Sequence, residues 1–245
     1  MIFTSTVPKL AMALVAALFV AACDEIPSPT TPIDSAPITP GKPSSTFQNK
    51  AQAERAFAQV TERVEPVAER ECRARTDGSN CDYRIVVDPD PSQPANAFQT
   101  FDKDGRPIIA FTIALINEAR NADEIAFVMG HEAAHHIAGH IARQQRNSAA
   151  TALVLGGIAA LGGASQASVD TAVQWGAQVG ARVYSKDFEL EADALGTIIS
   201  ARAGYSPLNG AKFFARIPDP GDRFLGTHPP NADRQRIVRE TVAKL

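Results

Sequence analysis

The sequence is short of basic charge, of long apolar runs near its start and of cysteine. Its 24 lysines and arginines are outnumbered by 27 aspartates and glutamates, and no basic patch stands out. Nucleic acid is therefore not an expected partner. The uncharged run that follows Lys9, residues 10–22, is too short to cross a bilayer and does not predict a membrane span. Cysteine occurs three times, so each one can be considered by itself.

The first 22 residues have the pattern of a secretory signal peptide. Lys9 precedes the uncharged run, which ends in small residues before Cys23. The segment VAAC at residues 20–23 resembles the bacterial lipobox, in which the signal is cut before a cysteine that then carries lipid. An ordinary signal with a chance cysteine is the alternative. We expect residues 1–22 to be removed and lipid on Cys23 to anchor the chain to a membrane.

A tether rich in proline, serine and threonine follows over residues 23–46. Such a composition cannot bury enough apolar surface to fold and is typical of an extended spacer. The remaining residues, 47–245, have the length of one domain with a hydrophobic core. Without residues 1–22 the chain loses only Lys9, which leaves 23 basic residues against 27 acidic ones.

Two cysteines remain in this domain, Cys72 and Cys81. An exported chain enters an oxidising compartment, where nearby cysteines tend to pair. The residues between them contain a turn signal that could bring them together. Two free thiols, or half of a metal site, are the alternatives. We expect a structural disulfide.

The pattern of apolar residues predicts an α+β domain that is mainly helical and has a small antiparallel sheet. An amphipathic helix is expected over residues 48–75, bent or interrupted at Pro66. A strand is expected at 83–87. Two more, at 97–101 and 107–111, flank a turn marked by an Asp-Gly pair. Three later helices are expected at residues 185–203, 208–216 and 231–244.

Residues 147–169 contain no charged side chain. The length of this run suggests a transmembrane helix. Its many glycine, serine and threonine residues favour instead a helical hairpin that is buried in the protein or faces a membrane.

Residues 130–140, GHEAAHHIAGH, hold four of the five histidines. A capping box that begins at Asn121 predicts that they lie on a helix. Each helical residue turns about 100°, so with His131 at zero, His135 lies at about 40° and Glu132 at about 100°. This is the His-Glu-x-x-His arrangement, in which two imidazoles chelate zinc and the glutamate faces the metal-bound water.

The other two histidines of this stretch, His136 and His140, fall at about 140° and 180° if the helix continues. They would form a second pair, four residues apart, on another face. Ile137 stands where that pair would need a general base. We expect these two histidines to pack and to hydrogen-bond around the site, with no ligand role.

A catalytic zinc site also needs a third protein ligand. One class of zinc proteases takes it from His-Glu-x-x-His-x-x-Gly-x-x-His. That class is excluded, because Ala138 and Ile141 occupy the glycine and third histidine positions. The other common source is a carboxylate on a later helix, and FELEAD at residues 188–193 offers one.

Within that later helix, Glu189 and Asp193 lie one turn apart on a shared face, whereas Glu191 lies about 200° from Glu189. The spacing suits a ligand carboxylate at Glu189 and, at Asp193, a carboxylate that orients a zinc-bound histidine. An ordinary charged helix face is the alternative. Glu191 is expected to be a surface residue without a role at the metal.

Three segments together, HEAAHH, ELEAD and then THPP with Arg234 following, resemble the HtpX and CAAX-prenyl-protease family of gluzincin metallopeptidases. The resemblance covers about residues 50–240 and is nearest to the soluble or lipid-anchored periplasmic branch. It implies a zincin-like fold with one zinc ion per chain. The ligands that it implies are His131, His135 and Glu189.

The same resemblance implies roles for four further residues. Glu132 matches the general base, and Asp193 matches a carboxylate that contacts a ligand histidine. His228 matches a histidine near the metal, which could stabilise the oxyanion or occlude the resting site. Arg234 matches an active-site arginine.

These observations predict a zinc endopeptidase on the periplasmic side of a bacterial envelope, tethered to a membrane by its N-terminal lipid. Its expected substrates are misfolded or misassembled envelope proteins. One alternative is an amidase that acts on peptidoglycan peptides. The other is a chaperone lipoprotein with a structural metal site, which Glu132 disfavours because a structural site needs no base.

Overall fold

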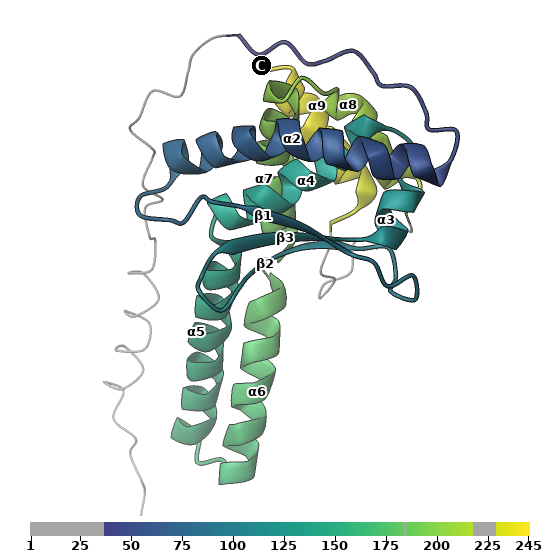
Figure 1. Cartoon of the computed structure of the whole chain (residues 1–245). Helices are drawn as coiled ribbons and strands as arrows, with labels where there is room; N and C mark the ends of the chain where they lie inside the picture. The colour runs from purple at the N-terminus through teal and green to yellow at the C-terminus, as the bar shows by residue number, and fades with distance from the viewer. Residues whose placement is uncertain (1–36, 184, 218–228) are drawn as a thin grey trace, which may run out of the picture. The chain divides into compact units, whose positions relative to one another are not determined.

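The computed structural model describes residues 37–183, 185–217 and 229–245 (Figure 1). The expected signal peptide, residues 1–22, and the expected lipidation site, Cys23, lie outside the described residues. So does the first part of the expected tether. Its last part, residues 37–46, lies against the domain, where the Gly41 amide donates to the Tyr205 carbonyl at 2.9 Å.

The domain contains three strands and a series of helices, among which η1 is a 3-10 helix. In chain order the described elements are α2 (Lys50–Arg75), β1 (Arg84–Asp88), β2 (Ala97–Phe101), β3 (Pro107–Thr112), α3 (Ile113–Glu118), α4 (Ala122–Ile137), α5 (His140–Leu161), α6 (Gln166–Val183), α7 (Ser185–Arg202), α8 (Pro207–Gly210), η1 (Ala211–Ala215) and α9 (Asn231–Val242). This confirms the expected α+β, mainly helical class.

The sheet has the order β1-β3-β2 and is mixed rather than antiparallel. The expected hairpin joins β2 to β3 through a turn in which Gly105 takes a φ of +79°. β1, however, pairs parallel to β3, with Val86 opposite Ala110. The prediction of a wholly antiparallel sheet is therefore wrong. The connection over residues 89–96 is long enough to carry the chain past β3, so that β1 and β2 lie on opposite edges.

The main core lies between α2, the sheet and α4. Val60 and Val64 of α2 are fully buried, and the Phe57 ring meets Phe111 of β3 edge to face, with 5.1 Å between centroids. Pro66 does not interrupt α2, which continues to Arg75. The structure joins Cys72, near the end of α2, to Cys81 in a disulfide, which holds the chain close to that helix as it enters β1.

Helices α4 and α7 pack unusually close to each other. A Cβ at Gly130 would lie 2.9 Å from the Gly196 carbonyl oxygen, and a Cβ at Gly196 would lie 2.8 Å from the His131 amide nitrogen. Only glycine allows this approach without a backbone shift. The close packing of α4 on α7 places the histidines of one helix beside the carboxylates of the other.

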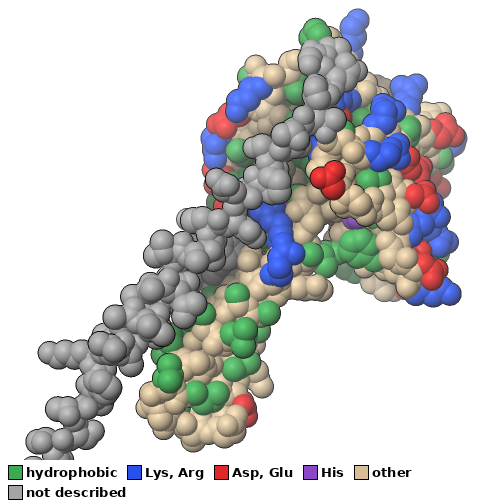
Figure 2. Space-filling view, turned by 90° about the vertical axis from the view of Figure 1, so that its left-hand side faces the viewer, with side chains coloured by type: hydrophobic (Ala, Val, Ile, Leu, Met, Phe, Trp, Pro, Cys, Tyr) green, Lys and Arg blue, Asp and Glu red, His purple; other side chains and the backbone are tan. Residues whose placement is uncertain are grey.

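Helices α5 and α6 form an antiparallel hairpin that extends away from the sheet and from the other helices (Figures 1 and 2). The two arms touch through glycines: a Cβ at Gly176 or Gly180 would lie 2.7 or 2.4 Å from a backbone oxygen of α5. A hairpin is present as expected, but it is longer than residues 147–169, because its two arms together span α5 and α6. The option that it is buried is wrong. Leu153 and Leu161 are 77% and 82% exposed. No helix in the described part of the chain is long and apolar enough to cross a membrane.

Candidate metal centre

The first turn of α4 is fixed by side-chain caps. Asn121 accepts a hydrogen bond from the Glu124 amide at 3.1 Å, as the sequence predicts for an N-cap. The Glu124 carboxylate reaches back to the Arg120 amide at 2.8 Å, and both of its oxygens also accept from Arg216 at 2.6 Å. These contacts set where α4 begins and therefore which of its faces meets α7.

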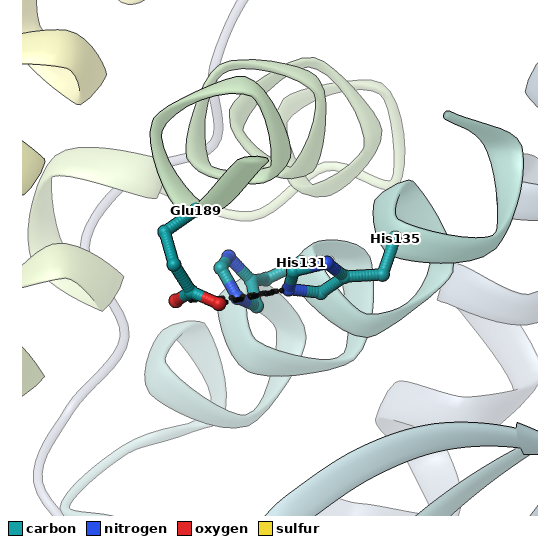
Figure 3. A group of neighbouring side chains, drawn as sticks. All are labelled: His131, His135 and Glu189. Carbon is teal, nitrogen blue, oxygen red and sulfur yellow. Dashed lines mark hydrogen bonds and ion pairs between the residues drawn. The ribbon is translucent and has the colours of Figure 1, made fainter. Parts of the chain in front are cut away.

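Three side chains from α4 and α7 converge on one point (Figure 3). The Nε2 atoms of His131 and His135 are 3.0 Å apart. The Glu189 carboxylate lies 3.5 Å from the first of these atoms and 3.4 Å from the second. As expected from the helical spacing, His131 and His135 therefore point to the same side of α4, and Glu189 of α7 points towards them.

The separations suit zinc. Bonds of about 2.0–2.1 Å in a tetrahedral site place neighbouring ligand atoms about 3.3 Å apart. The Nε2–Nε2 distance of 3.0 Å and the distances from His131 to Glu189 Oε2, 3.5 Å, and from His135 to Glu189 Oε1, 3.4 Å, lie close to this value. Two imidazoles and one carboxylate are also the donor set of a catalytic zinc site that keeps one position open.

Asp193 and Arg234 support the first histidine. The Asp193 carboxylate, which is fully buried, lies 2.9 Å from His131 Nδ1. Arg234 donates to both oxygens of Asp193 at 2.7 Å. The Arg234 guanidinium also packs 3.9 Å from the centre of the Phe214 ring. Arg234 also comes within 3.4 Å of Glu189. Its main contact is thus with Asp193, which it holds in place.

Electrostatics leave a proton on His131 in the metal-free site. Burial by itself lowers the pKa of this imidazole, but hydrogen bonds to Asp193 and Glu189, together with their charges, raise the pKa to about 10. The same effects act on Arg234: burial lowers the pKa of its guanidinium, but Asp193 and Glu189 raise that pKa by more. A metal that binds at His131 Nε2 must therefore displace a proton.

Glu132 lies beside the metal ligands in the wall of a cavity of about 690 Å³. Strand β2 also lines this cavity, through Ala97, Phe98 and Gln99. Among the described strands β2 pairs with β3 alone, so it is an edge strand of the sheet as well as part of the cavity lining. The arrangement places a carboxylate, a metal site and an unpaired strand edge around one open space.

His140 does not lie where a continuous helix would place it. α4 ends at Ile137, Gly139 adopts a left-handed φ of +63°, and His140 begins α5. The break turns His140 back towards the metal site, where its Nδ1 atom lies 2.8 Å from His135 Nδ1. The predicted pairing with His136 is therefore wrong. A glycine just beyond the last apolar position of a helix commonly ends it, so Gly139 was the signal for this break.

His136 lies away from the metal site, as expected. Its Nε2 donates to the Asn80 carbonyl at 2.8 Å, and its ring packs edge-on against Tyr83 and Phe101. The expectation for Glu191 was incomplete, because this side chain contacts His140 at 3.2 Å. The last candidate, His228, lies outside the described residues.

The fold and the site define a metallopeptidase with its ligands on two packed helices. Comparison with protein families agrees: the model of peptidase family M48 matches residues 54–242, and the chain belongs to this family. The resemblance inferred from the sequence motifs is thereby confirmed.

Two known proteins are similar to this chain over part of their length. The chain is 34% identical over 146 residues to a protein of Vibrio cholerae serotype O1 named as a beta-barrel assembly-enhancing protease, covering 54% of this chain and 30% of the relative. It is 28% identical over 141 residues to the mitochondrial metalloendopeptidase OMA1 of Arabidopsis thaliana, covering 54% and 27%. The matches thus span less than a third of each relative.

Proposed function

We propose that the protein is a zinc-dependent endopeptidase that cleaves misfolded or misassembled proteins of the bacterial envelope. The observation that carries the proposal is the convergence of His131, His135 and Glu189 at zinc-like separations beside Glu132, in an open cavity. The family supports peptidase chemistry.

Each residue of the site has a separate role in peptide hydrolysis. Zinc, when bound by the two histidines and Glu189, supplies Lewis acidity that lowers the pKa of the attacking water and polarises the scissile carbonyl. Glu132 accepts the proton of that water and delivers it to the leaving amine. Asp193 holds His131 with its Nε2 lone pair directed at the metal position, and Arg234 holds the Asp193 carboxylate in place through two hydrogen bonds.

The edge of β2 holds the substrate. An extended peptide can add to an unpaired strand edge through main-chain hydrogen bonds, which are independent of side-chain identity. Phe98 of β2, which is 44% exposed, Phe188 and Phe213 add apolar surface along the cavity. Recognition of this kind selects extended, unfolded segments over folded proteins.

The envelope location rests on the N-terminal sequence and on the name of the Vibrio cholerae relative. In this proposal lipid on Cys23 tethers the domain to a membrane on the periplasmic side. The tether and the signal sequence supply the route to that compartment.

Cleavage of casein by the purified chain tests the proposal. Hydrolysis should stop when a chelator removes the metal and return when zinc is added. Glu132→Gln should retain zinc but lose hydrolysis, because the amide keeps the shape of the side chain but cannot accept the proton. Hydrolysis that survives chelation would refute zinc dependence. Zinc-dependent binding of unfolded protein without any cleavage would support the chaperone alternative.

A further inference from the structure

The two candidate zinc histidines are held by different partners. His131 Nδ1 faces the carboxylate of Asp193. His135 Nδ1 faces another imidazole, that of His140, at 2.8 Å. On its other side His140 Nε2 lies 3.2 Å from Glu191 Oε2. A chain of contacts thus runs from Glu191 through His140 to the second histidine of the metal site.

We propose that His140 and Glu191 form a positioning pair that fixes the tautomer and orientation of His135 for metal binding. The inference rests on the zinc site proposed above and adds two residues to it. We assign neither a ligand role, because the side chains that could share one metal ion are His131, His135 and Glu189, and both ring nitrogens of His140 face other groups.

The direction of each hydrogen bond follows from the carboxylate at the end of the chain. An ionised carboxylate only accepts, so His140 carries its proton on Nε2 and donates it to Glu191. Its Nδ1 then holds a lone pair and accepts from His135 Nδ1–H. His135 is left with its lone pair on Nε2, the atom 3.4 Å from Glu189. The chain therefore leaves the metal-facing nitrogen free of a proton.

Packing fixes the His140 ring. The His140 ring stacks on Phe188, with 4.5 Å between centroids and 11° between planes. Arg143 covers the same phenylalanine ring at 4.4 Å and donates to Glu191 at 2.7 Å. The side chain of His140 is 5% exposed. Because its neighbours fix the ring, His140 can impose its orientation on His135.

Two substitutions separate positioning from simple packing. Asparagine places a polar atom at the position of imidazole Nδ1, whereas glutamine places one at the position of Nε2. His140→Asn therefore keeps the partner of His135 and loses the contact with Glu191. His140→Gln does the reverse. His136→Asn is the matched control, since that histidine is adjacent in sequence to His135 but bonds to Asn80.

The test measures the zinc dissociation constant of the full chain by competition with a chromophoric chelator, and the visible spectrum of the cobalt-substituted protein. His140→Gln should weaken zinc binding by roughly 10–100-fold, as the loss of a group that orients a ligand does. It should also alter the cobalt spectrum. His140→Asn should recover most of the affinity, and His136→Asn should bind zinc as the parent does.

Two results with the His140 variants would overturn the proposal. Parent-like zinc affinity in His140→Gln would overturn it, as would an equal loss in His140→Asn and His140→Gln. A parent protein that binds zinc but does not cleave casein would refute the proposed function and leave the positioning pair standing. Melting temperatures of the metal-free variants identify any that fail to fold. Glu191→Gln tests the pair at its other residue and should also weaken zinc binding. Unchanged zinc affinity in Glu191→Gln would overturn the proposal.

Discussion

Replacing Asp193 by alanine should destabilise the metal-free domain strongly, because it leaves a buried cation without its main partner. Arg234 is 7% exposed and donates to both Asp193 oxygens. Removing one member of a buried ion pair typically costs about 3–5 kcal/mol. Glu189 remains 3.4 Å from the guanidinium and compensates in part, so the low end of that range, about 3 kcal/mol, is expected.

Thermal unfolding of the metal-free protein measures this loss. For a domain of this size about 3 kcal/mol lowers Tm by roughly 6–12 °C. The double variant Asp193→Ala/Arg234→Met should recover much of the loss, because methionine leaves no buried charge and packs on Phe214. Asp233→Ala is the control, since Asp233 is adjacent to Arg234 but forms an exposed ion pair with Arg236, which is worth below about 1 kcal/mol.

Two results would refute this reasoning. One is a Tm loss in Asp193→Ala no larger than that in Asp233→Ala. The other is a double variant no more stable than Asp193→Ala alone, because the unpaired charge of Arg234 would then not be the cause of the loss.

Four further predictions concern the metal centre and the anchor. Glu189→Ala should strip zinc from the purified protein, whereas Glu191→Ala should weaken binding without abolishing it; atomic absorption would contradict this if the two variants lost equal metal. Zinc binding should release a proton near neutral pH, measurable by calorimetry in buffers of different ionisation enthalpy, because the pKa of metal-free His131 is about 10. The raised pKa of His131 also stabilises the metal-free fold. This contribution to stability is fully present below about pH 6.5 and should be lost as the pH rises through about 10. Equal stability of the metal-free domain below about pH 6.5 and above about pH 10 would contradict this prediction. Cys23→Ser should release the chain from membranes or block its processing, and a processed variant that still sediments with membranes would show another anchor.

Local periodicity predicted which candidate residues share a face within each helix, whereas the meeting of the two helices at one metal site was implied by the resemblance to a known family. Within one helix, spacing fixes relative direction, so His131 and His135 share a face, and so do Glu189 and Asp193. The hairpin between β2 and β3 is local for the same reason.

Features that depend on a break or on a distant partner could not be predicted in this way. Gly139 resets the helix direction, so the calculated phase of His140 no longer applied. The contact between His140 and Glu191 joins residues 51 apart, and no spacing rule reaches that far. β1 pairs parallel with a strand that is not its neighbour in sequence. The absence of charge in residues 147–169 favoured a hairpin that is buried or faces a membrane; among the described elements, each arm packs mainly against the other arm.

The α5–α6 hairpin is inserted between the two segments that carry the metal site. Its first arm begins at His140, and the helix after its second arm carries Glu189. The positions of the two ends of the hairpin are therefore constrained by the metal centre, whereas the position of its tip is not. A helix repeats about every 3.6 residues, so removing about seven residues from each arm deletes two turns and returns both ends to the same direction. The length of the hairpin is thus a property that evolution or protein engineering can change separately from the geometry of the metal centre.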